Sequence, residues 1–423
     1  MSGSPEQKLK FGFYSCMSGM PWGGSEELWW RSARLLQNQG HQIAVNYKWW
    51  EKQAEQLDEI VENGASLWLR EKPTKSYWYK KILDFFRSIK PSNGSDEAWL
   101  EKEKPDAVLF SLGYHPDRIR LAPACQKLGI PYTINVQCAS SSVFIHESLM
   151  EEFRNAYHGA HKVYFVSEEN QEKLETNMAT KLTNAEIVAN PFNVRHDANP
   201  DWPDEDVFKL ACVGRIHFMS KGQDLIAHVL RRDKWKNRNI QVSLYGKNQG
   251  NKKQLEELIK LYQLEDKLKF GGFTKNVEDI WKENHALFLP SRYEGAALVV
   301  IETMLCNRLV VTTDTGRNRE LINEGETGFI ASAAHADLLD EALESAWQVR
   351  HQWREMGIQA GKDIRENYTA NPIGDFADHL VESAQSKDSS SQNLSNNDLP
   401  GDSSSGGEAT EEVPLKQNLE SAQ

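Results

Sequence analysis

The sequence predicts an α/β protein with two doubly wound domains that face a cleft, followed by a disordered tail. Short apolar runs alternate with segments of helical period along most of the 423 residues. Such alternation is typical of parallel sheets covered by helices on both faces. A polar stretch with two prolines interrupts it between residues 195 and 204. Each of the two resulting series of strands and helices therefore predicts one domain.

The first series predicts an N-terminal domain over residues 1–195. Parallel strands are buried on both faces, so they appear in a sequence as short apolar runs. A segment of helical period at residues 26–39 follows the first of these runs. The expected strands lie at residues 11–14, 43–45, 107–110, 132–136 and 162–166.

The second series predicts a C-terminal domain over residues 207–383, joined to the first by a linker at residues 196–206. Helical spacing is clear at residues 254–261. Sheets of this kind bind ligands outside the carboxyl ends of their strands, so the cleft between the domains is the expected site. The expected strands lie at residues 209–213, 241–245, 268–270, 286–290 and 309–313.

An unusual segment at residues 49–104 is predicted to be an aromatic and basic insertion in the first domain. Residues 70–90 carry seven cationic side chains against two carboxylates, and several of their apolar residues have helical spacing. A basic amphipathic helix is suited to an anionic membrane surface or an acceptor molecule. An ordinary helix with a solvated basic face, packed on its domain, is the alternative.

Composition narrows the class of protein. Residues 384–423 are rich in Ser, Asn, Asp, Glu and Gly and contain no aromatic residue, which predicts a disordered acidic tail. The formal net charge of -12 argues against a non-specific nucleic-acid binder, which needs a basic surface.

The chain is expected to be cytoplasmic. The five cysteines form no CxxC pair, so we expect neither a disulfide framework nor a zinc ribbon. The N-terminus is polar, and no apolar run reaches the ~18 residues that would span a bilayer. Peripheral contact with the inner face of a membrane through residues 70–90 is left open.

The most informative motif follows the expected strand at residues 286–290. Gly295, Ala296 and Ala297 lead into a helix whose first backbone N–H groups are free to bind a phosphate. Glu294 lies at the mouth of this turn, and Glu302 lies about two helical turns further on. Carboxylates accept hydrogen bonds from hydroxyl groups, so one is suited to a sugar and the other to a ribose.

Two further motifs follow the first strand of each domain. Gly214 ends a strand and is followed by Arg215 and Lys221, two cations suited to a diphosphate; solvated surface positions are the alternative. In the first domain, Gly23 and Gly24 allow a backbone to approach a ligand closely. A purely structural turn explains these two glycines equally well, because the dinucleotide fingerprint GxGxxG is absent.

Together these motifs resemble the GT-B glycosyltransferases, specifically the retaining, group 1 type of family 4. The resemblance covers most of residues 11–375, and its most specific feature is the E-x7-E pattern of Glu294 and Glu302, with Arg215 and Lys221 upstream. It implies two Rossmann-like domains around a cleft. The donor would be a nucleotide-diphosphate sugar held mainly by the second domain, with no cofactor and no metal ion.

The resemblance also implies individual roles. Arg215 and Lys221, after Gly214, would neutralise the diphosphate, Glu294 would contact the sugar and Glu302 the ribose. The backbone from Gly295 through Ala296, Ala297 and Leu298 would bind the phosphates, with Gly23 and Gly24 approaching from the first domain.

One departure from the family pattern concerns the end of the strand at residues 132–136. Many relatives carry a histidine there, whereas this chain has Gln137. An amide can bind a sugar hydroxyl but cannot act as a base, which suits a mechanism in which the leaving phosphate takes the acceptor proton. His115 is a candidate replacement, and a structural histidine is the alternative.

The predicted function is retaining transfer of a hexosyl group from a nucleotide-diphosphate sugar to a saccharide or lipid-linked acceptor, as in polysaccharide biosynthesis. A nucleotide-sugar-binding protein of another class, such as an epimerase-like enzyme or an inactive scaffold, is the main alternative. A nicotinamide oxidoreductase is disfavoured because the chain lacks GxGxxG.

Overall fold

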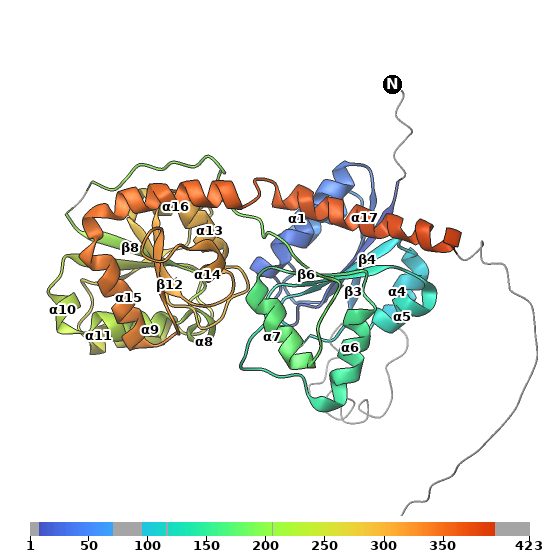
Figure 1. Cartoon of the computed structure of the whole chain (residues 1–423), viewed down its shortest axis with the longest axis horizontal. Coiled ribbons are helices and arrows are strands. Elements are labelled where there is room, and N and C mark those ends of the chain that lie inside the picture. The colour runs from blue at the N-terminus through green and yellow to red at the C-terminus, as the bar shows by residue number, and fades with distance from the viewer. Residues whose placement is uncertain (1–7, 71–94, 116, 205, 394–423) are drawn as a thin grey trace, which may run out of the picture.

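Two parallel β-sheets flanked by helices form the framework of this chain in a computed structural model (Figure 1). The structure describes residues 8–70, 95–115, 117–204 and 206–393. The first sheet has the strand order β3-β2-β1-β4-β5-β6-β7 and the second has the order β10-β9-β8-β11-β12-β13. These arrangements confirm the prediction of two doubly wound α/β domains.

The first sheet is deeply buried at its centre. All six residues of β4 are buried, as are all five of β5, because helices cover both faces of a doubly wound sheet. Its strands are β1 (Lys10–Ser15), β2 (Gln42–Lys48), β3 (Ser66–Arg70), β4 (Ala107–Leu112), β5 (Tyr132–Val136), β6 (Lys162–Phe165) and β7 (Ala185–Ile187). Its helices are α1 (Glu27–Asn38), α2 (Glu55–Glu62), α4 (Ser95–Glu103), α5 (Ala122–Leu128), α6 (Met150–His158) and α7 (Glu168–Met178), with 3-10 turns η1 (Gly24–Glu26) and η2 (Glu147–Leu149).

The second sheet repeats this plan with its own helices. Its strands are β8 (Phe208–Val213), β9 (Ile240–Tyr245), β10 (Leu268–Gly272), β11 (Ala286–Leu289), β12 (Leu309–Thr313) and β13 (Gly328–Ala331). Its helices are α8 (Phe218–Lys221), α9 (Gln223–Leu230), α10 (Asp233–Lys236), α11 (Lys252–Leu261), α12 (Val277–Glu283), α13 (Leu298–Leu305), α14 (Asn318–Leu321), α15 (Ala336–Gln348) and α16 (Trp353–Asn367), with a 3-10 turn η3 (Arg350–Gln352).

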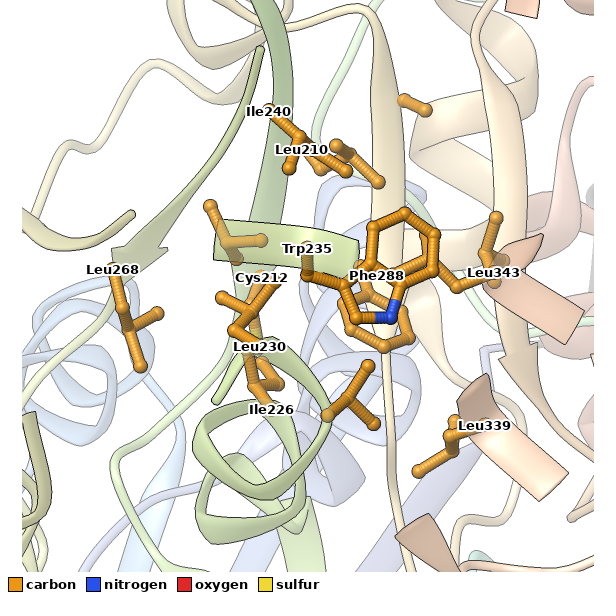
Figure 2. Close-up of a cluster of buried hydrophobic side chains, with 14 of the residues drawn as sticks. Leu210, Cys212, Ile226, Leu230, Trp235, Ile240, Leu268, Phe288, Leu339 and Leu343 are labelled. Carbon is orange, nitrogen blue, oxygen red and sulfur yellow. The ribbon is translucent and has the colours of Figure 1, made fainter. Parts of the chain in front are cut away.

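A dense apolar core supports the second sheet. Figure 2 shows Trp235 between Leu210, Phe288 and Leu343, all of which are fully buried. The indole N–H of Trp235 donates to a carboxylate oxygen of Asp340 at 2.5 Å, so its polar atom is satisfied inside the core. This packing fixes the strands whose carboxyl ends face the first domain.

The last helix, α17 (Pro372–Asn393), returns to the first domain and lies along α1 (Figure 1). Its side chains Phe376 and Leu380 join Leu28 and Trp29 in the core of the first sheet. The predicted second domain of residues 207–383 therefore contains a helix that packs on the first domain. The same helix covers the first ten residues of the predicted tail, and residues 394–423 lie outside the described residues.

The predicted insertion at residues 49–104 is corrected in part. Residues 66–70 form β3, which pairs with β2 as a regular strand of the first sheet. Trp99, on α4, is fully buried in the core. Residues 71–94 lie outside the described residues, and most of the predicted basic helix at 70–90 falls there. Among the described residues, no helix combines the length and apolar character needed to cross a membrane.

Candidate functional site

The loops predicted to carry the site meet where each sheet changes its winding direction. In the first sheet β1 lies beside β4, and in the second β8 lies beside β11. Chains leave the two strands of such a pair in opposite directions, so a crevice forms at their carboxyl ends. The guanidinium of Arg215, after β8, reaches the sulfur of Met20, after β1, at 3.2 Å. The crevices of both domains therefore face one another.

Lys221 and Glu294 form an ion pair in this crevice. The Nζ atom of Lys221 lies 2.5 Å from Oε1 of Glu294, and the two side chains are only 15% and 11% exposed. The hydroxyl of Ser291 donates to the same carboxylate oxygen at 2.6 Å. Gly222 has φ +63° and leaves no room for a Cβ atom, which would lie 2.1 Å from the Pro290 carbonyl oxygen. This close approach brings the end of α8 to the end of β11.

Arg215, the other cation of the predicted pair, lies in the loop that follows β8. Its Nη1 atom donates to the amide oxygen of Gln249 at 2.6 Å. Within the part of the chain that the structure describes, its guanidinium thus pairs with neutral groups and not with a carboxylate. Gly214 precedes it at the end of β8. The arrangement leaves a cation for an anionic ligand.

Gly295, Ala296 and Ala297 precede α13, which begins at Leu298, as the sequence predicted. The residue before the helix, Ala297, provides no side-chain cap, so its side chain does not bind the first backbone N–H groups of α13. A Cβ atom at Gly295 would lie 1.7 Å from the carbonyl oxygen of Gln137 in the first domain. The helix terminus therefore opens directly at the domain boundary, with the positive end of its dipole toward it.

Glu302 accepts hydrogen bonds from Asn193, in the segment that joins the two domains. Its side chain is 3% exposed, and its Oε1 atom accepts from the backbone N–H of Asn193 at 3.0 Å and from the Asn193 amide at 2.8 Å. Burial raises the pKa of Glu302, and the two bonds partly offset this rise. Arg31 on α1 donates in turn to the Asn193 side chain. Glu302 therefore links the two domains through Asn193.

Gln137 follows β5 and is 5% exposed. Its amide oxygen accepts from Asn190 at 3.0 Å, which fixes the orientation of the amide. Its Nε2 atom is buried and has no hydrogen-bond partner among the described residues. A buried amide N–H without a partner costs free energy. A ligand atom that accepts from it at the domain boundary would recover that free energy.

His115 is buried completely, and both of its ring nitrogens are engaged by the main chain. Its Nε2 atom lies 3.0 Å from the carbonyl oxygen of Val143, and its Nδ1 atom accepts from the N–H of Ser140 at 3.3 Å. Burial lowers the pKa of His115 to about 4. The proposed role as a replacement base is therefore not supported, because this imidazole is neutral and holds a loop.

The glycine turn after β1 approaches α13 and leads to Glu26, a carboxyl group with a raised pKa. Gly23 precedes η1, and a Cβ atom at Gly24 would lie 3.8 Å from Leu298. Glu26 is fully buried; its Oε2 atom accepts from Ser15 at 2.8 Å and from the Trp29 indole at 2.9 Å. Burial raises the pKa of Glu26 to about 7. Only the three-dimensional packing reveals that this carboxyl group is buried.

Two contacts between the domains also escaped sequence analysis. The Glu169 carboxylate, on α7, accepts from the backbone N–H of Gly316, which follows β12. Glu320 accepts from the backbone N–H of Glu168, at the start of α7, at 2.8 Å. The first turn of a helix attracts carboxylates, which explains why Glu320 is held there. Among the described residues, no group of three or more His, Cys, Asp or Glu side chains could hold a metal ion.

Comparison with known proteins identifies the second domain. Residues 197–363 match the family of group 1 glycosyl transferases. The chain is 31% identical over 128 residues to the lipopolysaccharide core biosynthesis mannosyltransferase LpcC of Rhizobium leguminosarum bv. viciae, which covers 28% of this chain and 35% of that protein. It is 26% identical over 118 residues to N-acetyl-alpha-D-glucosaminyl L-malate synthase of Bacillus anthracis, covering 28% and 31%. The chain thus matches about a third of the length of these two relatives.

Similar solved structures cover both domains. Anabaena HepE in complex with UDP has a TM-score of 0.67 at 15% identity and covers 89% of this chain and 100% of that one. A glycosyltransferase from Rickettsia africae has a TM-score of 0.67 at 16% identity and covers 92% and 100%. These likenesses extend the shared fold to the first domain. The second domain thus matches the group 1 glycosyl transferases, and the two domains together have the fold of these GT-B structures.

Proposed function

We propose that this chain is a retaining glycosyltransferase that moves a hexosyl group from a nucleotide-diphosphate sugar to a saccharide or lipid-linked acceptor without a metal ion. The observation that carries the proposal is the partly buried ion pair of Lys221 and Glu294 beside the uncapped start of α13. A cation, a carboxylate that can accept from hydroxyl groups, and free backbone N–H groups meet there. A sugar diphosphate needs a partner of each kind.

The donor diphosphate binds between Lys221, Arg215 and the start of α13. Negative charge grows on the diphosphate as the glycosidic bond breaks, and preorganised cations stabilise that charge most in a partly buried site. Lys221 then exchanges its bond to Glu294 for one to phosphate, which frees Glu294 to accept from a sugar hydroxyl. The same region belongs to the family-matched residues 197–363.

The nucleoside lies toward Glu302, which accepts from a ribose hydroxyl after sharing or releasing Asn193. Support comes from the chemistry of this buried carboxylate, whose pKa is raised by burial. A hydroxyl donor would compensate the same burial that Asn193 now compensates. The similar HepE structure contains UDP, and by this analogy we propose a uridine or other nucleoside diphosphate here.

Retention is supported by the chemistry of two residues, Gln137 and His115, that the sequence predicted for the acceptor side. Gln137 offers an N–H donor and His115 is sealed in a loop, so neither takes a proton. In the proposed step the bond from the anomeric carbon to phosphate breaks, and the bond to the acceptor oxygen forms on the same face. The acceptor proton moves to the departing phosphate oxygen, which balances charge.

The proposal is tested with the full chain, UDP-glucose and GDP-mannose, and a coupled assay of nucleotide release. We expect Lys221→Ala and Glu294→Gln each to lower kcat/KM by ~10². The exposed residues Lys253 and Glu257 on α11 provide matched controls, Lys253→Ala and Glu257→Gln, which should keep full turnover. Full turnover in either site variant would show that the site is wrongly assigned.

The same assay separates the alternative classes of protein. A nucleotide-sugar-binding scaffold would gain thermal stability with UDP or GDP but release no nucleotide. An epimerase-like enzyme would convert the sugar without an acceptor, which product chromatography detects. If no nucleoside diphosphate raised the thermal stability of the protein, all of these classes would be excluded.

A further inference from the structure

Two tyrosines from opposite domains face each other at the mouth of the site. Tyr114 follows β4 and Tyr293 follows β11, and their ring centroids lie 6.1 Å apart with an interplanar angle of 37°. Both side chains are half-buried, so each keeps an accessible part. Tyr293 also adjoins a residue of the site, because Glu294 follows it.

Both tyrosines stand next to anchored residues. The His115 ring packs edge-on against Tyr114 at 5.0 Å, and the main chain holds His115 through Val143 and Ser140. On the other side, Arg292 precedes Tyr293 and forms two bonds to Asp224, of 2.8 and 2.7 Å. Rings held in this way lose little freedom when a ligand packs on them.

A titratable residue, Asp117, follows Tyr114 by three positions. The N–H of Asp117 donates to the carbonyl oxygen of Tyr114 at 3.1 Å, so the two residues share one turn. Asp117 is half-buried, and burial raises its pKa to about 6. A carboxylate of this kind accepts hydrogen bonds from hydroxyl groups.

Within the described residues, three cations around the pair are already engaged, and the proposed function assigns a fourth, Arg215, to the donor diphosphate. Lys221 pairs with Glu294, Arg118 donates to Glu152 at 2.8 Å, and Lys48 donates to the Ser18 carbonyl oxygen at 3.1 Å. A ligand group that bears a phosphate or carboxylate would need an uncommitted cation. The aromatic faces and Asp117 instead match a neutral ring with an apolar C–H face and hydroxyl groups at its edge.

We propose that Tyr114, Tyr293 and Asp117 form the acceptor subsite and that it takes a neutral saccharide ring. The ring packs against the accessible side of the tyrosine pair, and its hydroxyls donate to Asp117. This inference rests on the proposed glycosyl transfer and names the class of group that receives the sugar. It places the acceptor beside Glu294, which is where the donor sugar would lie.

Binding of simple glycosides tests the subsite without turnover. The probes are the methyl glycosides of glucose, galactose, mannose and N-acetylglucosamine, measured by saturation-transfer NMR on the full chain with UDP or GDP bound. We expect at least one probe to bind, and Tyr114→Ala and Asp117→Asn each to weaken it by about 10-fold. Tyr262→Ala, at a half-buried tyrosine at the end of α11, should bind like the wild type.

Three results would overturn the inference. In the first, no probe binds the nucleotide-loaded protein. In the second, Tyr114→Ala binds the probes as the wild type does. In the third, glucose 6-phosphate or methyl glucuronide binds more tightly than the neutral glycosides. Nucleotide affinity is measured in parallel by thermal shift. Wild-type protein that binds no nucleotide would contradict the proposed function itself, whereas intact nucleotide binding with any of these results rejects only the subsite.

Discussion

Gly295 of the second domain lies against the main chain of Gln137 in the first. A Cβ atom at position 295 would stand 1.7 Å from the Gln137 carbonyl oxygen and 3.1 Å from a methyl group of Val166. Glycine is therefore required here for the start of α13 to reach the other domain. The close approach also brings the unpartnered amide of Gln137 to the site.

A methyl group at this position should separate the domains locally. We expect Gly295→Ala to lower kcat/KM by ~10², because small displacements of a positioned reacting group reduce rates steeply. Steady-state kinetics with UDP-glucose or GDP-mannose measure the effect. Gly19→Ala adds a methyl group where no atom lies within 4 Å and should retain most activity. Equal activity of the two variants would argue against this close approach.

The buried carboxyl of Glu26 should make stability depend on pH. Its pKa rises from 4.5 to about 7 on folding because of burial. Between these values the unfolded chain is ionised and the folded chain is protonated, so stability falls as pH rises, by about 3 kcal/mol in total. Glu26→Gln should therefore stabilise the protein more at pH 8 than at pH 4.5.

Urea unfolding of wild type and Glu26→Gln at the two pH values measures this difference. Glu51→Gln, at an exposed position, controls for the loss of one carboxylate and should show little pH-dependent change. A Glu26→Gln effect that is independent of pH would mean that Glu26 ionises normally in the folded protein.

His115 should act with the opposite sense of pH. Its pKa falls from 6.5 to about 4 on folding, so between these values only the unfolded chain binds the proton. Stability should decrease by about 3 kcal/mol as pH falls from 6.5 to 4. We expect His115→Asn to flatten this dependence in urea titrations. The dependence of kcat on pH should show the same ionisations in His115→Asn as in the wild type. Loss of one ionisation in the variant would mean that His115 carries a proton in the reaction.

The bond between Asn193 and Glu302 should stabilise the junction of the domains. Removal of the amide leaves a buried carboxylate with one donor fewer, which costs about 1–3 kcal/mol. Asn193→Ala should lower the free energy of unfolding by that amount, as measured with urea. UDP should recover more of this loss than 2′,3′-dideoxy-UDP if a ribose hydroxyl replaces Asn193. Asn367→Ala, at an exposed position, should leave stability within 0.5 kcal/mol, roughly the usual range for surface changes.

Local patterns in the sequence predicted the central parts of the fold and several residues of the site. Strands such as β4 and β5 are buried on both faces, so their apolar runs are recognisable without tertiary information. Glu294 and Lys221 stand at the ends of such strands and their loops, and parallel strands place those ends at one edge of a sheet. Edge strands such as β3 are half-exposed and carry weaker signals.

Contacts between distant segments were decided by the tertiary structure. The apolar side chains of α17 do not by themselves reveal which sheet they cover, and they cover the first. The pairing of Lys221 with Glu294 joins two loops of the second domain, and His115 is sealed between loops of the first. The facing of Tyr114 and Tyr293 depends on how the two domains are placed. Spacing along a chain encodes neighbours within a helix or strand, whereas these contacts join loops that only the folded structure brings together.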